Sequence, residues 1–391
     1  MFFTFSEESS YGMDATSQDY VLDLVSEEII TNLQYEKVQQ FNKPTSEDRI
    51  PTIKTGKGRV TLDLTYGNEA WNVILKSLVG QSVLLNNYAF SKSSESWNIV
   101  TGQLANALNL SDTSFTITEY KNGEFDDVDG IIVGNEYIAI TVISNGVVTV
   151  SSRASEGTTA TSHDQYTLCY GVVSEANKQI DIISRYRDGY CYYLPTSLTS
   201  LIYREGDYYE FTGCIFSDFV FNAHQNTIDS SLQMFSKNSR IIEMASPSVS
   251  IDNNDFVSPL DINCYSMNQG FLLQKLYFQI SNTLYQGPAK FFDTTYSGIM
   301  LYGHSAYGQF TLDDETSAAY NSYIEDEIRN FSVTICESKQ FDNAYEFAFN
   351  NLRYGTMIRV LYSSIDLKGD SVPFFSYDSD GFVIMIQRET S

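Results

Sequence analysis

A short stretch that occurs twice constrains the fold of this chain more than any other feature. Both copies read Gly-x-apolar-Thr-Leu-Asp and are soon followed by Ala-aromatic-Asn, and they occupy residues 58–72 and 308–321. In each copy, a strand-like alternation passes into residues that favour the start of a helix. The sequence therefore predicts a duplicated strand-to-helix unit, in a chain built from two related parts.

The residue content favours a β-dominated protein. Tyr (28 residues) and Phe (25 residues) are abundant, and aromatic side chains suit the pleated, half-buried surface of a sheet. At 391 residues the chain exceeds the usual size of one hydrophobic core. We therefore expect a mainly β fold divided into two or three domains.

The charge of the chain argues against ordinary nucleic-acid binding. Asp and Glu number 49 against 24 Lys and Arg, which gives a formal net charge of −25. A field of that sign repels phosphate backbones, which a nucleic-acid binder attracts with cationic side chains. Solubility is the simplest interpretation of the charge.

The cysteines and the apolar runs indicate where the protein is made. The five cysteines are odd in number, widely spaced and without a Cys-x-x-Cys pair, so they match neither a disulfide framework nor a zinc site. The N-terminus lacks the basic and apolar regions of a signal peptide, and no apolar run reaches the ~18 residues of a membrane-spanning helix. We expect a soluble protein made in a reducing cytoplasm.

The first part of the chain predicts one strand, one long loop and one helix. Residues 22–41 alternate as a strand with one solvent-exposed face, with a helix around residues 26–28 as the alternative. The Pro- and Gly-containing residues 42–58 are expected to form an exposed loop. Asn68 is the predicted N-cap of a helix that ends at Gly80, and its apolar side chains recur at helical spacing: Trp71, Ile74, Leu75 and Leu78. This apolar face predicts packing against a sheet.

The middle of the chain predicts a small β-module. Residues 86–125 are rich in Ser, Asn and Asp and are expected to form loops. After them, Asn145-Gly146 separates two β-rich runs, which is the strongest local signal for a hairpin. We predict a module at about residues 125–185, built as a barrel or a small sandwich.

The second part of the chain again predicts strands and one helix. In residues 227–235, Ile228, Leu232 and Met234 share one parity while polar residues share the other, so one face is core and the other polar. Thr316 or Ser317 is expected to cap a helix that carries the second Ala-aromatic-Asn. A domain boundary is predicted near residue 205.

No local pattern predicts catalysis or a metal site. His163, His224 and His304 are far apart, and residues 126–130 and 378–381 lack the ligand spacing of a calcium loop, so Asp-Gly turns explain them better. Paired carboxylates are unavoidable in so acidic a chain and carry little information. We find no glycine-rich phosphate loop or dinucleotide fingerprint. We expect no enzymatic activity, cofactor or metal.

Two stretches resemble the tail tube (major tail) proteins of long-tailed bacteriophages. They are residues 57–66 with the helix that follows over 71–79, and residues 209–219, which read Tyr-Glu-Phe-Thr-Gly-Cys-Ile-Phe-Ser-Asp-Phe. The resemblance covers most of residues 20–85 and 205–391. It implies two tandem tail-tube-like β-sandwich domains, each with a flanking α-helix, plus the small inserted β-module.

The resemblance also implies a division of the chain and a mode of assembly. An N-terminal arm (1–20) would precede a first tube-like domain (21–205) with the module inserted at about 125–185, and a second tube-like domain (206–391) would follow. In this family the sheets of neighbouring subunits join into rings, and two-domain members form rings of three chains. Stacked rings make a conduit through which DNA passes without specific binding.

The implied location is the virion tail, after synthesis in the host bacterial cytoplasm. The implied partners are other copies of the chain, the tape measure protein, and the tail terminator and baseplate proteins, with no membrane. An acidic bore would keep the genome from sticking, because it removes the counterion-release contribution to binding. The candidate lumen-facing residues are Asp229 and Gln233, with Gln34 and Glu36 as counterparts in the first repeat.

Two other functions remain open from the sequence. The chain could be another ring-forming tail component, such as a distal tail, baseplate hub or tail completion protein. It could instead be a surface-binding or carbohydrate-binding β-protein in which the module at 125–185 contacts the ligand. The scarcity of Trp (2 residues) weakens the carbohydrate hypothesis.

Overall fold

A computed structural model gives the structure of most of the chain. It describes residues 2–13, 15, 17–39, 47–92, 99–119, 123–184, 196–204, 207–224, 227–242, 255–266, 269–271, 273–286, 299–312, 329–337, 342–354, 358–361, 368–376 and 382–390. The protein is mainly β, with 69% strand and, among the described residues, the single α-helix α1 (Glu69–Val79). The expected fold class is confirmed at this level.

The elements follow one another along the chain as antiparallel strands with few helical turns. The first part contains β1 (Phe2–Glu7), β2 (Tyr20–Gln39), β3 (Glu47–Leu62), β4 (Gln81–Phe90), β5 (Thr101–Leu104), β6 (Ser114–Glu119), β7 (Gly130–Val133), β8 (Glu136–Ser144), β9 (Val147–Ser152), the 3-10 turn η1 (Ser155–Gly157), β10 (Leu168–Ser184) and β11 (Leu198–Arg204). The second part contains β12 (Asp207–His224), β13 (Thr227–Ser236), β14 (Asn238–Ile242), the 3-10 turn η2 (Pro259–Asp261), β15 (Ile262–Ser266), β16 (Gln269–Phe271), β17 (Leu273–Gln286), β18 (Ile299–Leu312), β19 (Arg329–Cys336), β20 (Ala344–Tyr354), β21 (Ile358–Leu361), β22 (Lys368–Ser376) and β23 (Phe382–Glu389).

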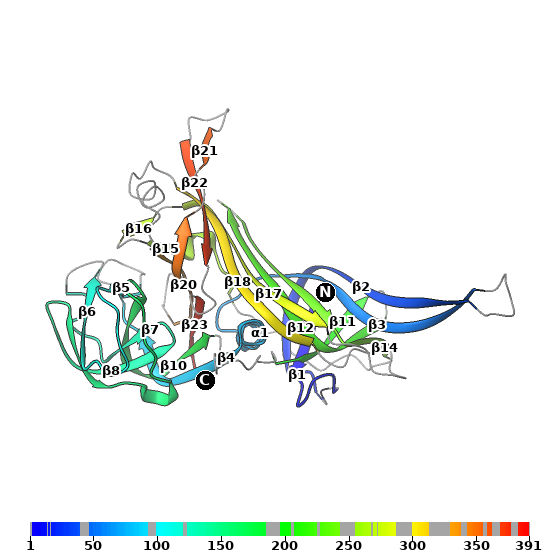
Figure 1. The fold of residues 1–391 in the computed structure, drawn as a ribbon, viewed down its shortest axis with the longest axis horizontal. Helices are drawn as coiled ribbons and strands as arrows, with labels where there is room; N and C mark the ends of the chain where they lie inside the picture. Colours follow the sequence, from blue (N-terminus) through cyan, green and yellow to red (C-terminus); the bar gives the residue numbers. More distant parts are fainter. Residues whose placement is uncertain are drawn as a thin grey trace.

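Strands β2, β3, β12, β17 and β18, together with the shorter β13 and β22, form one antiparallel sheet, which we call the long sheet. Its order is β2–β3–β13–β12–β17–β18–β22. Figure 1 shows β12, β17 and β18 running side by side, and β2 beside β3. In β13, Leu232 and Met234 are fully buried while Asp229 is exposed. The alternation predicted for this strand is confirmed, so the long sheet has one core face and one polar face.

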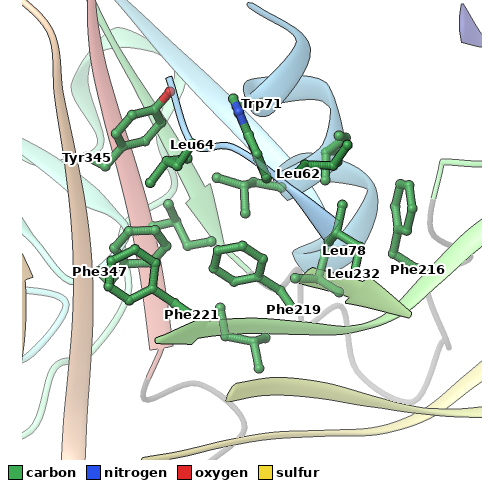
Figure 2. Close-up of a cluster of buried hydrophobic side chains, with 14 of the residues drawn as sticks. Leu62, Leu64, Trp71, Leu78, Phe216, Phe219, Phe221, Leu232, Tyr345 and Phe347 are labelled. Carbon is green, nitrogen blue, oxygen red and sulfur yellow. The ribbon is translucent and has the colours of Figure 1, made fainter. Parts of the chain in front are cut away.

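Helix α1 packs on the core face of the long sheet. Asn68 caps it through a 2.9 Å hydrogen bond that its side-chain oxygen accepts from the backbone N–H of Ala70. At the other end Gly80, with φ 146°, closes the last turn. Trp71 is fully buried and its ring centroid lies 6.2 Å from that of Phe219 in β12 (Figure 2). The predicted cap, apolar face and end of the helix are confirmed.

A second sheet, the back sheet, closes the main core from the other side. Its order is β4–β10–β23–β20–β19–β15, all antiparallel. Phe347 of β20 stacks with Phe219 of the long sheet at a centroid distance of 6.1 Å, as Figure 2 shows. Burial of aromatic side chains from both sheets makes this sandwich the main hydrophobic core.

A small closed barrel stands at one end of the molecule. Its pairings form a circle, β10–β5–β6–β9–β8–β7–β10, in which β10 contributes its first part, near Leu168 to Val172. The predicted Asn145-Gly146 hairpin joins β8 to β9, and both residues have positive φ, as a type I′ turn requires. Figure 1 places this small barrel opposite the end to which β2 and β3 project.

The repeated stretch lies at the same place in two hairpins. Gly58 to Leu62 are the last residues of β3, the second strand of the β2–β3 hairpin, and Gly308 to Leu312 are the last residues of β18, the second strand of the β17–β18 hairpin. Asp313 and the helix predicted after it lie outside the described residues. The strand portion of the repeat is therefore present in both copies.

Two expectations from the sequence are wrong. Residues 47–58 belong to β3 rather than to a loop, and residues 86–125 contain the end of β4 together with β5 and β6. The physical reason in β3 is that Pro51, which cannot donate to a ladder, sits where the β2–β3 register is irregular. Strand β13 pairs with β3 only from Gly56 onward, so the proline interrupts no described ladder on that side.

The start of the chain is also more ordered than expected. Strand β1 pairs with β2 and β11, and Phe3 and Phe5 are fully buried. Glu8 accepts hydrogen bonds from the backbone N–H groups of Gly12 and Gly213, at 2.7 Å each. Residues 2–7 are therefore held in the sheet, because burial of these two rings fixes them.

Candidate functional surface

The polar face of the long sheet carries two of the four predicted functional residues, Asp229 and Gln233. Asp229 is exposed and Gln233 half-buried, and Gln233 donates a 2.9 Å hydrogen bond to the carbonyl oxygen of Gly58. Gln34 and Glu36 lie in β2, opposite Ile53 and Ile50 of β3, and their side chains are outside the described part. The four candidates thus belong to two strands, β2 and β13, of the long sheet.

Charges of both signs lie on this face, with acids in excess. Cross-strand register places Glu28 opposite Arg59 and Arg59 opposite Gln233, so these side chains share the polar face. The described carboxylates on or beside it are Asp23, Glu28, Asp63, Asp218 and Asp229, and the described cations are Lys57, Arg59 and Lys275. The Lys57 ammonium group lies 4.7 Å from the centroid of the Phe235 ring, so it already makes a cation–π contact within the face.

A connected hydrogen-bond network spans three strands of the polar face. The Asp218 carboxylate accepts from Ser281 at 2.6 Å and from the Gln279 amide at 2.9 Å. The Gln279 side-chain oxygen in turn accepts from the hydroxyls of Tyr277 at 2.8 Å and Tyr307 at 2.6 Å. Because each member satisfies another, the network holds these polar side chains in fixed positions.

One end of the polar face gathers three carboxylates. The pKa of Asp63 is raised above its usual value, first by partial burial and then by the nearby charges of Asp23 and Asp229. Asp63 closes the first copy of the repeated stretch, so the repeat places a carboxyl at this end of the sheet. Among the described residues no group of His, Cys, Asp and Glu is arranged to hold a metal ion.

The small barrel contains a buried ionic cluster that no sequence pattern predicted. Glu136 is fully buried, and Arg153 donates to both of its carboxylate oxygens, at 2.6 and 2.7 Å. His163 lies 3.0 Å from the same carboxylate, and the Thr161 N–H donates at 3.2 Å. Burial acts to raise the pKa of Glu136, but the hydrogen bonds from Arg153, His163 and Thr161 outweigh it and lower the pKa to about 2.

This cluster is structural in character, because its side chains satisfy one another. Nothing in the local sequence around residues 136, 153 and 163 signals it, since the barrel alone brings them together. His224 is exposed at the end of β12, and the side chain of His304 in β18 is outside the described part. No two of the three histidines are brought into one described site.

The Asp-Gly stretches form no cation site in the part that the structure describes. Asp129 accepts a 2.7 Å hydrogen bond from the backbone N–H of Ser174, and Asp126 lies in a turn after Gly123. Residues 378–381 lie outside the described ranges. Among the described residues, no helix has the length and apolar character needed to span a membrane.

Comparison with known proteins adds no relative. No protein-family model matches the chain, and no curated protein matches it.

Proposed function

We propose that this chain is a structural protein without enzymatic activity that assembles with copies of itself into stacked rings, the tail tube of a long-tailed bacteriophage. Two tube-like units per chain would give a ring of three chains. DNA would pass through the bore without specific binding. The tape measure, tail terminator and baseplate proteins would be its other partners in the virion.

The observation that carries the proposal is a repeated strand order within one sheet. The hairpin β2–β3 is followed across the sheet by β13, whose hairpin partner is β12. The hairpin β17–β18 is followed by β22, whose hairpin partner is β21. The Gly-x-apolar-Thr-Leu stretch ends the second strand in both hairpins, so the sequence repeat and the strand order support the same duplication.

The projecting part of the β2–β3 hairpin supports assembly with other subunits. From residue 47 to residue 55, the described pairings of β3 are to β2 alone. Strand β1 pairs with β2 only over residues 20–23. Figure 1 shows this two-stranded ribbon extending past the rest of the sheet. An isolated two-stranded hairpin is marginally stable in water, so contacts with another chain would stabilise it.

The polar face of the long sheet is the surface we assign to the bore. Its described carboxylates outnumber its described cations, and Asp218 and Gln279 are held by neighbouring side chains rather than free to reach a phosphate. Such a wall repels a polyanion and offers it few donors. The projecting small barrel would then lie on the outside of the tube.

Electron microscopy of the purified chain tests the proposal directly. We expect long tubes with an open bore and rings of three chains. Isolated rings that do not stack would instead support a distal tail, baseplate hub or tail completion protein. Persistent monomers that bind glycans would support the surface-binding alternative and overturn the tube.

Thiol labelling tests which face lines the bore. Asp229→Cys places a thiol on the polar face, and Ser111→Cys places one on the exposed surface of the small barrel as a matched control. In the unassembled chain both should react with a bulky maleimide. In tubes only Ser111→Cys should still react, whereas equal reaction at both positions would place Asp229 outside the bore.

A further inference from the structure

The small barrel is attached to the back sheet through the strand that they share. In β10, Leu168 and Tyr170 point out of the barrel into a hydrophobic cluster with back-sheet residues such as Ala348 and Met385. Cys169, between them, points into the barrel's own core. The barrel thus has a complete core of its own and rests on β19, β20 and β23 through a separate contact, which we call the seat.

The seat contains polar ties as well as apolar packing. The Asn330 amide of β19 donates to the Gln103 side-chain oxygen at 2.8 Å and to the Tyr166 carbonyl at 2.6 Å. On β20, the Asn350 oxygen accepts a buried 2.9 Å hydrogen bond from the backbone N–H of Leu168. A contact made partly of such hydrogen bonds resembles an interface between domains more than a continuous core.

Glu346 of β20 is buried in the middle of this seat. Its side chain shares a face with Ala344 and Ala348, towards the barrel, and it is 0% exposed. Thr334 of β19 donates a 2.5 Å hydrogen bond to one carboxylate oxygen. The other oxygen, the Ser332 hydroxyl and the Tyr170 hydroxyl are buried without a hydrogen bond of ordinary geometry to any described residue.

No cation among the described residues faces Glu346. The titratable groups around it are Tyr170 from β10, Cys264 from β15 and Cys336 from β19, all neutral at ordinary pH, while β23 presents the apolar Met385. Burial raises the pKa of Glu346 to about 7, although the hydroxyls of Thr334, Ser332 and Tyr170 act in the opposite direction. A buried carboxylate without a cationic partner favours its neutral form.

We propose that the seat is a proton-dependent latch: neutral Glu346 holds the small barrel against β19 and β20, and loss of its proton releases the barrel as a unit. When the seat opens, the proton of the buried Glu346 carboxyl passes to solvent. The open carboxylate becomes hydrated and regains an ordinary pKa. The latch operates in the single chain and does not depend on tube assembly.

Hydrogen exchange at the backbone N–H of Leu168 measures opening of the seat. With a pKa of 4.5 in the open state and about 7 in the seated state, the opening constant should rise by roughly 20-fold from about pH 5.5 to about pH 7.5. This rise is measured after correction for the intrinsic pH dependence of exchange. Amides inside the barrel, such as that of Ile117, should show no such rise, because the barrel moves intact.

Two variants separate the latch from a merely structural contact. Glu346→Gln keeps the shape of the side chain without the titrating proton, so exchange at Leu168 should become independent of pH over this range. Thr334→Val removes the hydroxyl that donates to Glu346 and lowers its pKa, so the midpoint of the transition should move to higher pH.

The outcomes decide the proposal even if one variant folds poorly. An unchanged midpoint in Thr334→Val, or the same pH dependence in Glu346→Gln as in the natural chain, would overturn it. So would a natural chain whose exchange at Leu168 shows no corrected change with pH. Failure of tube formation would leave this result untouched, because all measurements use the unassembled chain.

Discussion

Gly58 of β3 and Gly308 of β18 occupy equivalent positions and are crowded in the same way. A Cβ atom on Gly58 would clash with the carbonyl oxygen of Glu28, and one on Gly308 would clash with the carbonyl oxygen of Tyr277 and with the ring of Phe374. In each hairpin that carbonyl belongs to the residue just before the one paired with the glycine. The repeated stretch therefore begins with glycine because two backbones approach closely there.

Replacing either glycine should destabilise the sheet. We expect Gly58→Ala and Gly308→Ala each to lower the free energy of unfolding by about 2 kcal/mol, because a partner strand must shift to admit the methyl group. Chemical denaturation of the purified chain measures this. Ser305→Ala, at an exposed position of β18, is the control and should change stability by less than about 0.5 kcal/mol.

The start of α1 depends on one side chain. Asn68→Ala removes the hydrogen bond to the Ala70 N–H and should cost about 1 kcal/mol of stability. Asn68→Asp keeps an acceptor oxygen at the cap and should retain most of it. If thermal denaturation shows the two variants equally destabilised, the cap contributes through something other than this hydrogen bond.

The ionic cluster of the small barrel should make the barrel sensitive to acid. The pKa of Glu136 is lowered to about 2 from a usual value of 4.5, so its stabilising contribution is present above pH 4.5 and is lost as the pH falls towards 2. Glu136→Gln should remove this dependence and destabilise the barrel at neutral pH by about 3 kcal/mol, because Arg153 loses its buried partner.

A matched control for the cluster lies on the same barrel. Glu156 is exposed, so Glu156→Gln should leave both the stability and its acid dependence nearly unchanged. The measurement is the unfolding free energy from denaturant titrations at several pH values. A natural chain whose stability is flat from pH 5 to pH 2 would contradict the assignment.

The pKa of Asp63 should depend on the charge of Asp229 nearby. Since the charge of Asp229 contributes to the raised pKa of Asp63, Asp229→Asn should lower the pKa of Asp63. Carbon-detected NMR titration of a chain with labelled Asp measures the shift. Asp218→Asn is the control, because Asp218 lies elsewhere on the face, and an equal shift in both variants would argue against the pairing of Asp63 with Asp229.

The four described cysteines should resist thiol reagents in the folded chain. Cys169, Cys214, Cys264 and Cys336 are buried, and burial raises the pKa of each thiol above its usual value. The thiolate is the reactive form, so labelling should be slow until denaturant is added. Mass spectrometry of modified peptides identifies which cysteines react, and fast modification of any of these four would contradict the packing described.

The local features of this protein follow from residues that lie close together in the chain. Asn68 and Gly80 bound the helix, Asn145-Gly146 makes the hairpin, and the alternation around Leu232 separates core from polar face. Each of these signals involves residues close in sequence, where capping, turn geometry and side-chain parity act directly. The same reasoning identified the repeated stretch, although only its strand portion lies within the described residues.

The pairing of strands that are far apart in the chain becomes visible only in the folded protein. Residues 47–58 form a strand despite Pro51 because β2 pairs with them, and β5 and β6 exist because the small barrel closes around them. The hydrogen-bond partners of Glu136 likewise come from segments far apart in the chain. The same holds for the surroundings of Glu346, where no cation among the described residues faces the carboxyl group. Pairing of this kind is set by long-range backbone hydrogen bonds and shared burial, which no local pattern of residues records.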